Sequence, residues 1–103
     1  MFGMLGRLTA APGKGDELAA ILLDAAAALE ADDDCLLYVV SRAQDDPDSV
    51  VVSEAWRSEE AHRASLERDE VRALISRAGP LLAGPPEPIR LRPLGGKGLE
   101  PQR

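Results

Sequence analysis

Aromatic side chains are scarce in this sequence. Among its 103 residues, only Phe2, Tyr38 and Trp56 supply Phe, Tyr or Trp rings. The core must therefore be built mainly from Leu, Val, Ile and Ala. A small domain with so little aromatic bulk often gains stability by burying a further surface in a partner, and most such assemblies are symmetric. We expect a homodimer.

Three other features are also missing. A single cysteine, Cys35, excludes an internal disulfide and fits a reducing compartment. No apolar run approaches the roughly 18 residues that span a bilayer, and the first residues lack the charged segment of a secretory signal. The net charge of −6 argues against nucleic acid, because phosphate binding needs a basic surface. We expect a cytoplasmic protein that binds neither membrane nor nucleic acid.

Ligands for a metal or a cofactor are equally sparse. One histidine, His62, and one cysteine make a zinc site within one chain improbable. The run Asp32-Asp33-Asp34 does not match the spacing of a calcium loop. No glycine-rich phosphate loop follows a strand, so flavin or nicotinamide binding has no sequence support. We expect no metal and no cofactor.

The order of local patterns predicts an α+β fold. Strand patterns at residues 2–10, 35–40, 50–56 and 89–92 are separated by a helix over 16–31, capped by Asp16, and a broken helix over 58–82. Ser58 and Asp69 are the expected N-caps of the broken helix. The resulting β-α-β-β-α-β order is typical of the ferredoxin-like fold, an antiparallel four-stranded sheet with helices on one face.

This fold leaves the other face of the sheet uncovered. The middle strands are rich in apolar residues, so we expect two sheets to pack together in the dimer. Residues 1–94 form the predicted domain. Residues 95–103 contain three of the nine glycines and a proline, and we expect them to form a flexible C-terminal tail.

The most informative segment is residues 53–62, where a valine-rich strand turns directly into a helix. It holds the only Trp and the only His of the chain. Strand alternation places Glu54 and Trp56 on the same face, two residues apart. A carboxylate beside the largest aromatic side chain, at the edge of a helix, indicates a pocket.

Three segments carry a resemblance to a known family. They are Pro12-Gly13, Cys35-Leu36-Leu37-Tyr38 and Glu54-Ala55-Trp56-Arg57-Ser58-Glu59-Glu60-Ala61. Together they resemble the antibiotic biosynthesis monooxygenase (ABM) domain family, which includes small quinol monooxygenases. The resemblance implies a dimeric α/β barrel and oxidation of a small aromatic substrate by dioxygen without a cofactor.

The chain also departs from that family. Family members commonly carry a histidine where this sequence has Ser65, and His62 lies one helical turn earlier, where we expect it to point elsewhere. The heme-degrading branch also uses an asparagine, and this sequence contains none. The resemblance therefore does not extend to heme, and acid–base catalysis at position 65 is in question.

Each candidate site residue has a functional and a structural interpretation. Trp56 is either a pocket wall that stacks on a planar substrate or a core residue. Glu54 is either a base with a raised pKa or, as we favour, a structural carboxylate that accepts a hydrogen bond or pairs with Arg7, Arg90 or Arg92. We expect His62 to be exposed, with the role of a base at the pocket mouth as the alternative.

Tyr38 and Cys35 are the candidates on the second strand. Tyr38 either donates a hydrogen bond to a substrate oxygen or fills the core. Cys35 is expected to be an inert thiol.

These observations lead to one main hypothesis and two alternatives. The main hypothesis is a cofactor-independent monooxygenase that acts on an electron-rich aromatic such as a quinol or a polyketide phenol. The first alternative is a binding or scaffold dimer without activity, and the second is an isomerase of a small phosphorylated carbonyl compound, which requires Arg90 and Arg92 to point inward. The candidate catalytic residues are Trp56, Glu54, Tyr38 and His62, and the candidate substrate-binding residues are Leu37, Trp56, Ser65 and Leu74.

Overall fold

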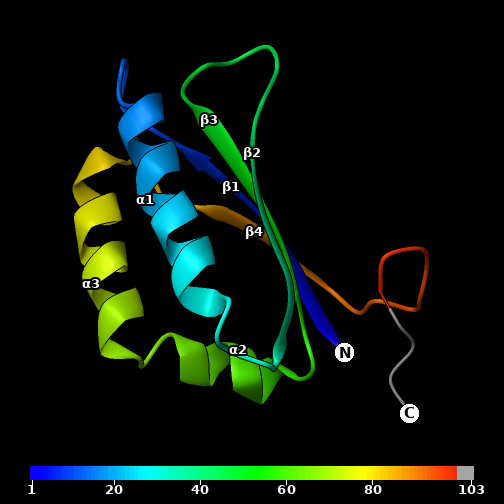
Figure 1. Cartoon of the computed structure of the whole chain (residues 1–103). Helices are drawn as coiled ribbons and strands as arrows, with labels where there is room; N and C mark the ends of the chain where they lie inside the picture. Colours follow the sequence, from blue (N-terminus) through cyan, green and yellow to red (C-terminus); the bar gives the residue numbers. More distant parts are fainter. Residues whose placement is uncertain (100–103) are drawn as a thin grey trace.

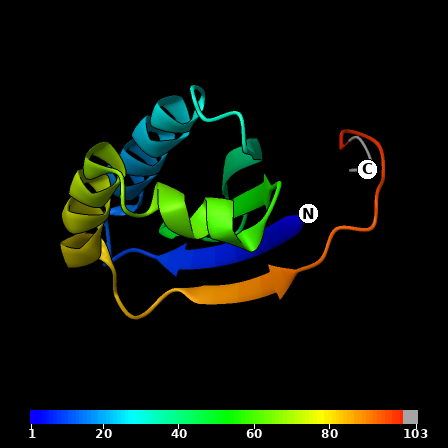
Figure 2. The same ribbon diagram turned by 90° about the horizontal axis from the view of Figure 1, so that it is seen from below.

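The computed structural model describes residues 1–99 and confirms the ferredoxin-like α+β fold (Figure 1). Four antiparallel strands form one sheet in the order β2-β3-β1-β4. Figure 2 shows the helices gathered on one side of this sheet. The strands are β1 (Phe2–Thr9), β2 (Cys35–Arg42), β3 (Ser49–Trp56) and β4 (Glu87–Leu91), and the helices are α1 (Gly15–Leu29), α2 (Glu59–Ser65), α3 (Asp69–Ala78) and the 3-10 turn η1 (Gly79–Leu81).

The start of α1 differs from the prediction. Asp16 is not the N-cap: the helix begins at Gly15, and the N-cap position, Lys14, makes no side-chain cap. Instead, the carboxylate of Asp48, in the turn between β2 and β3, accepts hydrogen bonds from the backbone N–H groups of Gly13 (3.2 Å) and Gly15 (3.0 Å). Asp16 pairs with Arg42 at 2.9 Å. A carboxylate from a distant turn therefore satisfies helix-start donors that a local cap usually satisfies.

The second helical region is broken, as predicted. Ser58 caps α2 by accepting a hydrogen bond from the Ala61 N–H at 3.1 Å. Asp69 is the first residue of α3 rather than its N-cap, a position that Arg68 occupies. Because a carboxylate in the first turn still faces the positive end of the helix dipole, Asp69 favours a helix start at either position.

Strand register decides which side chains share the space under the helices. Glu54 on β3 pairs with Met4 on β1 and with Tyr38 on β2, so these three side chains point to the same face of the sheet. An irregularity between Cys35 and Leu37 shifts the register at the start of β2. Tyr38 consequently faces the helices, and Leu37 faces the opposite side.

The core lies between the sheet and the helices in two clusters. One joins α1 to the start of β3 and the end of α3. The other joins the start of β1 and the ends of α1 and β3 to α3. The first consists of Ala10, Leu18, Ile21, Val50 and Ala78, and the second of Phe2, Leu29, Trp56 and Val71.

The opposite face of the sheet is uncovered and partly apolar. Register places Leu5, Ile89 and Leu91 on this face, together with Val39, and all four side chains are exposed. Within residues 1–99, no helix is long and apolar enough to cross a membrane. The predicted tail, residues 95–103, lies partly outside the described residues.

Candidate active site

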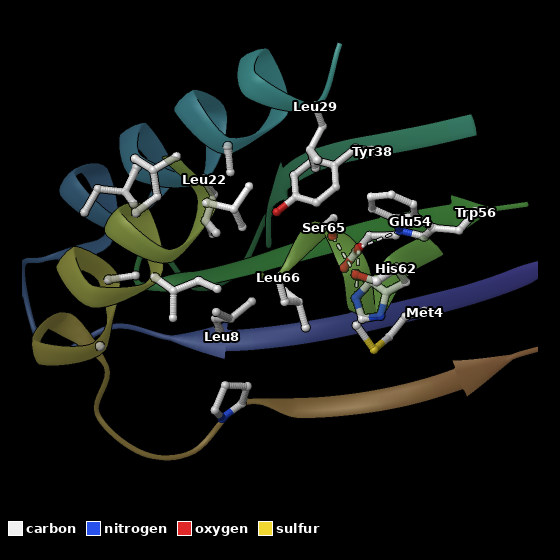
Figure 3. Close-up of a pocket in the computed structure, with 18 of the residues that line it drawn as sticks. Met4, Leu8, Leu22, Leu29, Tyr38, Glu54, Trp56, His62, Ser65 and Leu66 are labelled. Carbon is white, nitrogen blue, oxygen red and sulfur yellow. Dashed lines mark hydrogen bonds and ion pairs between the residues drawn. The ribbon is translucent and has the colours of Figure 1, made fainter. Parts of the chain in front are cut away.

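A cavity of about 300 Å³ lies between the sheet and the helices (Figure 3). Most of its wall is apolar and comes from β1, α1 and α3, and Leu74 is among the lining residues. Four polar residues lie together along part of the wall, on β2, β3 and α2. We call Tyr38, Glu54, His62 and Ser65 the polar cluster.

Trp56 and Glu54 form the centre of the site. The Trp56 side chain is fully buried, and its indole Nε1–H donates a hydrogen bond of 3.0 Å to Oε1 of Glu54. Burial raises the pKa of the Glu54 carboxyl, and the hydrogen bond from Trp56 partly offsets this effect. Trp56 is thus both a core residue and part of the cavity wall, and it orients the carboxylate.

The prediction that His62 is exposed is wrong. The side chain is buried, because α2 lies across the ends of β1 and β3, and its ring packs against Phe2 and Trp56 with centroid distances of 5.3 and 5.5 Å. Its Nε2 atom lies 3.7 Å from Oε1 of Glu54. Burial lowers the pKa of His62, and the nearby Arg90 lowers it further. The imidazole is therefore neutral near pH 7 and contacts Glu54 without a full ion pair.

Ser65 lies on the same face of α2 as His62. We expected His62 to point elsewhere, but residues three apart on a helix are neighbours, and both side chains line the cavity. The Ser65 hydroxyl is buried and donates a 2.6 Å hydrogen bond to the backbone carbonyl of His62. This bond occupies the only proton that Ser65 can donate.

Tyr38 directs its hydroxyl toward the cavity (Figure 3). Burial raises the pKa of this phenol, and the charge of Glu54 raises it further, so the hydroxyl stays protonated and can donate. Within residues 1–99, neither the Tyr38 hydroxyl nor Oε2 of Glu54 has a hydrogen-bond partner. Neither atom is fully buried, so both can be reached from the cavity. Both are open to a ligand.

Leu37 does not line this cavity, contrary to the prediction. It follows the register shift at the start of β2 and faces away from Tyr38. It contributes instead to a second, shallower depression at the edge of the sheet. The uniformly apolar run at residues 35–40 contains no polar alternation that could show this orientation in the sequence.

The arginines considered as partners of Glu54 lie elsewhere. Arg90 pairs with Glu59, and its guanidinium lies over the Phe2 ring, 5.5 Å from the centroid. Arg7 and Arg92 are exposed. Glu54 accepts a hydrogen bond from Trp56 and contacts His62 instead. Of the two structural roles expected for it, the accepted hydrogen bond is confirmed and the ion pair with an arginine is wrong. Over the described part of the chain, no lysine or arginine side chain lines the cavity.

Cys35 and the acidic residues do not add a reactive centre. Burial raises the pKa of the half-buried Cys35 thiol to about 11, with the charges of Glu54 and Asp32 as smaller causes. A thiol with such a pKa is protonated and unreactive at neutral pH. Across residues 1–99, no three His, Cys, Asp or Glu side chains are grouped so that they could hold a metal ion.

Comparison with known proteins identifies the family. The sequence profile described as antibiotic biosynthesis monooxygenase matches residues 1–77, which include the whole polar cluster and Trp56. The chain belongs to the ABM family. A comparison with curated proteins found no match.

Solved structures of other proteins share this fold. A candidate antibiotic biosynthesis monooxygenase from Chloroflexus aurantiacus is 37% identical, with coverage of 96% of this chain and 98% of the other and a TM-score of 0.86. A candidate from Caulobacter crescentus is 27% identical, with coverage of 91% and 90% and a TM-score of 0.84. A Mycobacterium tuberculosis protein is 23% identical over 93% and 97%, with a TM-score of 0.83, and shows the fold alone.

Proposed function

We propose that this ABM protein is a cofactor-independent monooxygenase that oxidises an electron-rich aromatic hydroxyl compound, a quinol or a phenol, with dioxygen. The observation that carries the proposal is a largely apolar cavity with a partly buried carboxylate beside an available phenol hydroxyl. Membership of the ABM family supports it. An apolar cavity with a few convergent polar groups is typical of small-molecule sites.

Glu54 is the proposed base. Its Oε1 atom is oriented by Trp56, so Oε2 remains to accept the proton of the substrate hydroxyl. A raised carboxyl pKa makes this proton transfer more favourable at neutral pH. The Tyr38 hydroxyl donates to the resulting oxyanion, and the apolar wall keeps water away from it.

The deprotonated substrate supplies all the electrons in this scheme. A quinol with an open ring position reacts with one dioxygen molecule to give a hydroxyquinone and one water molecule. The substrate loses four electrons, a new carbon–oxygen bond takes one oxygen atom, and the other oxygen atom leaves as water. The role of the protein is to bind the substrate, accept its proton and exclude solvent.

The isomerase alternative lacks support in the cavity. A phosphorylated ligand needs cationic groups, yet the described lining contains Glu54 and no arginine or lysine. The binding or scaffold alternative keeps one supporting observation, because Ser65 stands where family members commonly have a histidine. That alternative uses the same cavity and predicts aromatic binding without oxygen consumption.

The proposed assembly is a cytoplasmic homodimer in which two sheets pack face to face. The exposed Leu5, Val39, Ile89 and Leu91 supply an apolar surface for this contact. A second copy presents the same surface, as a two-fold interface requires.

Oxygen consumption tests the proposed activity. The purified protein would be mixed with benzoquinols and naphthoquinols in the presence of a chelator, and uptake would be followed with an oxygen electrode. We expect uptake above the uncatalysed rate and a large loss in Trp56→Phe, which keeps an aromatic ring but removes the donor to Glu54. The control Glu60→Gln changes a carboxylate with 78% side-chain exposure and should retain activity.

Two results would contradict the proposal. Folded protein that consumes no oxygen with any quinol, yet binds it, would support the binding-protein alternative. Uptake that is equal in wild type and Trp56→Phe would exclude the role assigned to the Trp56–Glu54 pair.

A further inference from the structure

A second depression, of about 200 Å³, lies beside the main cavity. It is formed by the C-terminal part of α1 and the first residues of β2, at the edge of the sheet. Leu29 and Tyr38 line both spaces. They are therefore the side chains that the main cavity and this edge depression have in common.

Leu29 and Tyr38 lie side by side in Figure 3. Leu29 is buried in the same apolar cluster against which Tyr38 packs, whereas Tyr38 is only half-buried. The Tyr38 hydroxyl faces the main cavity, and its ring stands between that cavity and the edge depression. We call the pair Leu29 and Tyr38 the partition.

The polar cluster fixes where the partition lies relative to a ligand. A substrate hydroxyl that binds Glu54 and Tyr38 lies next to the partition, and its ring system extends into the rest of the cavity, toward Leu22 on α1. At about 300 Å³ the main cavity is at the small end of the usual range for ligand pockets. A ring fused on the far side of the hydroxyl-bearing ring would collide with Tyr38.

We propose that the Leu29–Tyr38 partition determines substrate size: it admits aromatic hydroxyl compounds of one or two rings and excludes three-ring compounds whose hydroxyl is on the central ring. This inference rests on the proposed function, from which it takes the aromatic ligand and the pose of its hydroxyl. Removal of either side chain would join the two spaces and make room for the third ring.

Binding of two unreactive probes under nitrogen tests this proposal. Equilibrium dialysis would give the dissociation constants of naphthol, with two rings, and phenanthrol with its hydroxyl on the central ring. Wild type should prefer naphthol. Tyr38→Ala should shift the ratio of the two constants toward phenanthrol by about tenfold or more, the scale on which a filled or emptied pocket discriminates ligands.

Two further variants separate the ring from the hydroxyl. Tyr38→Phe removes the donor but keeps the ring, so both probes should bind more weakly and their ratio should not change. Leu29→Ala opens the partition from the other side while it keeps the Tyr38 hydroxyl, and it should shift the ratio in the same direction as Tyr38→Ala. Circular dichroism would confirm that each variant is folded.

The outcomes distinguish this inference from the oxygenase proposal. An unchanged ratio in folded Tyr38→Ala and Leu29→Ala would overturn the partition, even if wild type consumed oxygen. A shifted ratio without oxygen consumption would support the partition and contradict the oxygenase. A wild type that binds phenanthrol as tightly as naphthol, or that binds neither probe, would also overturn the partition.

Discussion

The indole N–H of Trp56 donates a hydrogen bond to the carboxylate of Glu54, two residues earlier on the same strand. The two side chains share a face of the sheet because they are two residues apart on a strand, and this face is the one that the helices cover. The fully buried indole fixes one carboxylate oxygen and leaves the other available in the cavity. Four predictions follow from this site and from the scaffold around it.

The Glu54→Gln variant tests the base. The amide has nearly the shape of the carboxyl but cannot accept a proton from a phenol, so kcat should fall by about 10²–10⁴-fold. In wild type, kcat/KM should rise with pH through the raised pKa of Glu54, above the ordinary value of 4.5. A pH–rate profile of both proteins, measured by oxygen uptake, would show this rise of kcat/KM with pH only in wild type. An equal rise in Glu54→Gln would mean that another residue is the base.

The lowered pKa of His62 makes stability depend on pH. Below the ordinary pKa of 6.5 the unfolded state binds more protons than the folded state, so the free energy of unfolding should fall as the pH drops from 6.5 toward the lowered pKa. Glu54 acts in the opposite direction because its pKa is raised. Urea unfolding should therefore be compared between Glu54→Gln and Glu54→Gln/His62→Phe. If the free energy of unfolding fell by the same amount in both proteins as the pH dropped, the assignment to His62 would be contradicted.

Gly15 has no room for a side chain. A Cβ atom there would lie 2.1 Å from the backbone oxygen of Pro47, far inside any normal contact. We expect Gly15→Ala to lower the free energy of unfolding by about 1–3 kcal/mol, the usual range for overpacking. Gly84→Ala is the matched control, because nothing lies within 4 Å of its Cβ position. Urea unfolding curves of the two variants should differ clearly, and equal curves would refute the steric argument.

The uncovered sheet face should carry the dimer. Sedimentation equilibrium of wild type should give twice the 11.0 kDa mass of one chain. Val39→Lys should shift the measured mass toward that of a single chain, because the lysine charge would be buried in the dimer contact without a partner. Leu23→Lys is the control, since Leu23 is 56% exposed on α1, away from that face. A single-chain mass for wild type at micromolar concentration would rule out the dimer.

Local sequence patterns were sufficient to predict the order of elements and the shared face of Glu54 and Trp56. They failed where the deciding contact is distant or where neighbouring charges hide the pattern. His62 is surrounded by Glu59, Glu60 and Arg63, which suggested exposure, yet α2 lies across the strand ends and turns His62 inward. Leu37 was misplaced because the shift in β2 register leaves no trace in an apolar run.

The carboxylate of Asp48 has a consequence for how the chain folds. It completes the start of α1 from a position 33 residues beyond Gly15, so the first turn of that helix is finished only after a long loop has closed. Starting a helix is its least favourable step, and here that step depends on the hairpin of β2 and β3. The helix and the hairpin should therefore form as one cooperative unit. An N-terminal fragment that ends before residue 48 would lack the group that completes the start of its only long helix.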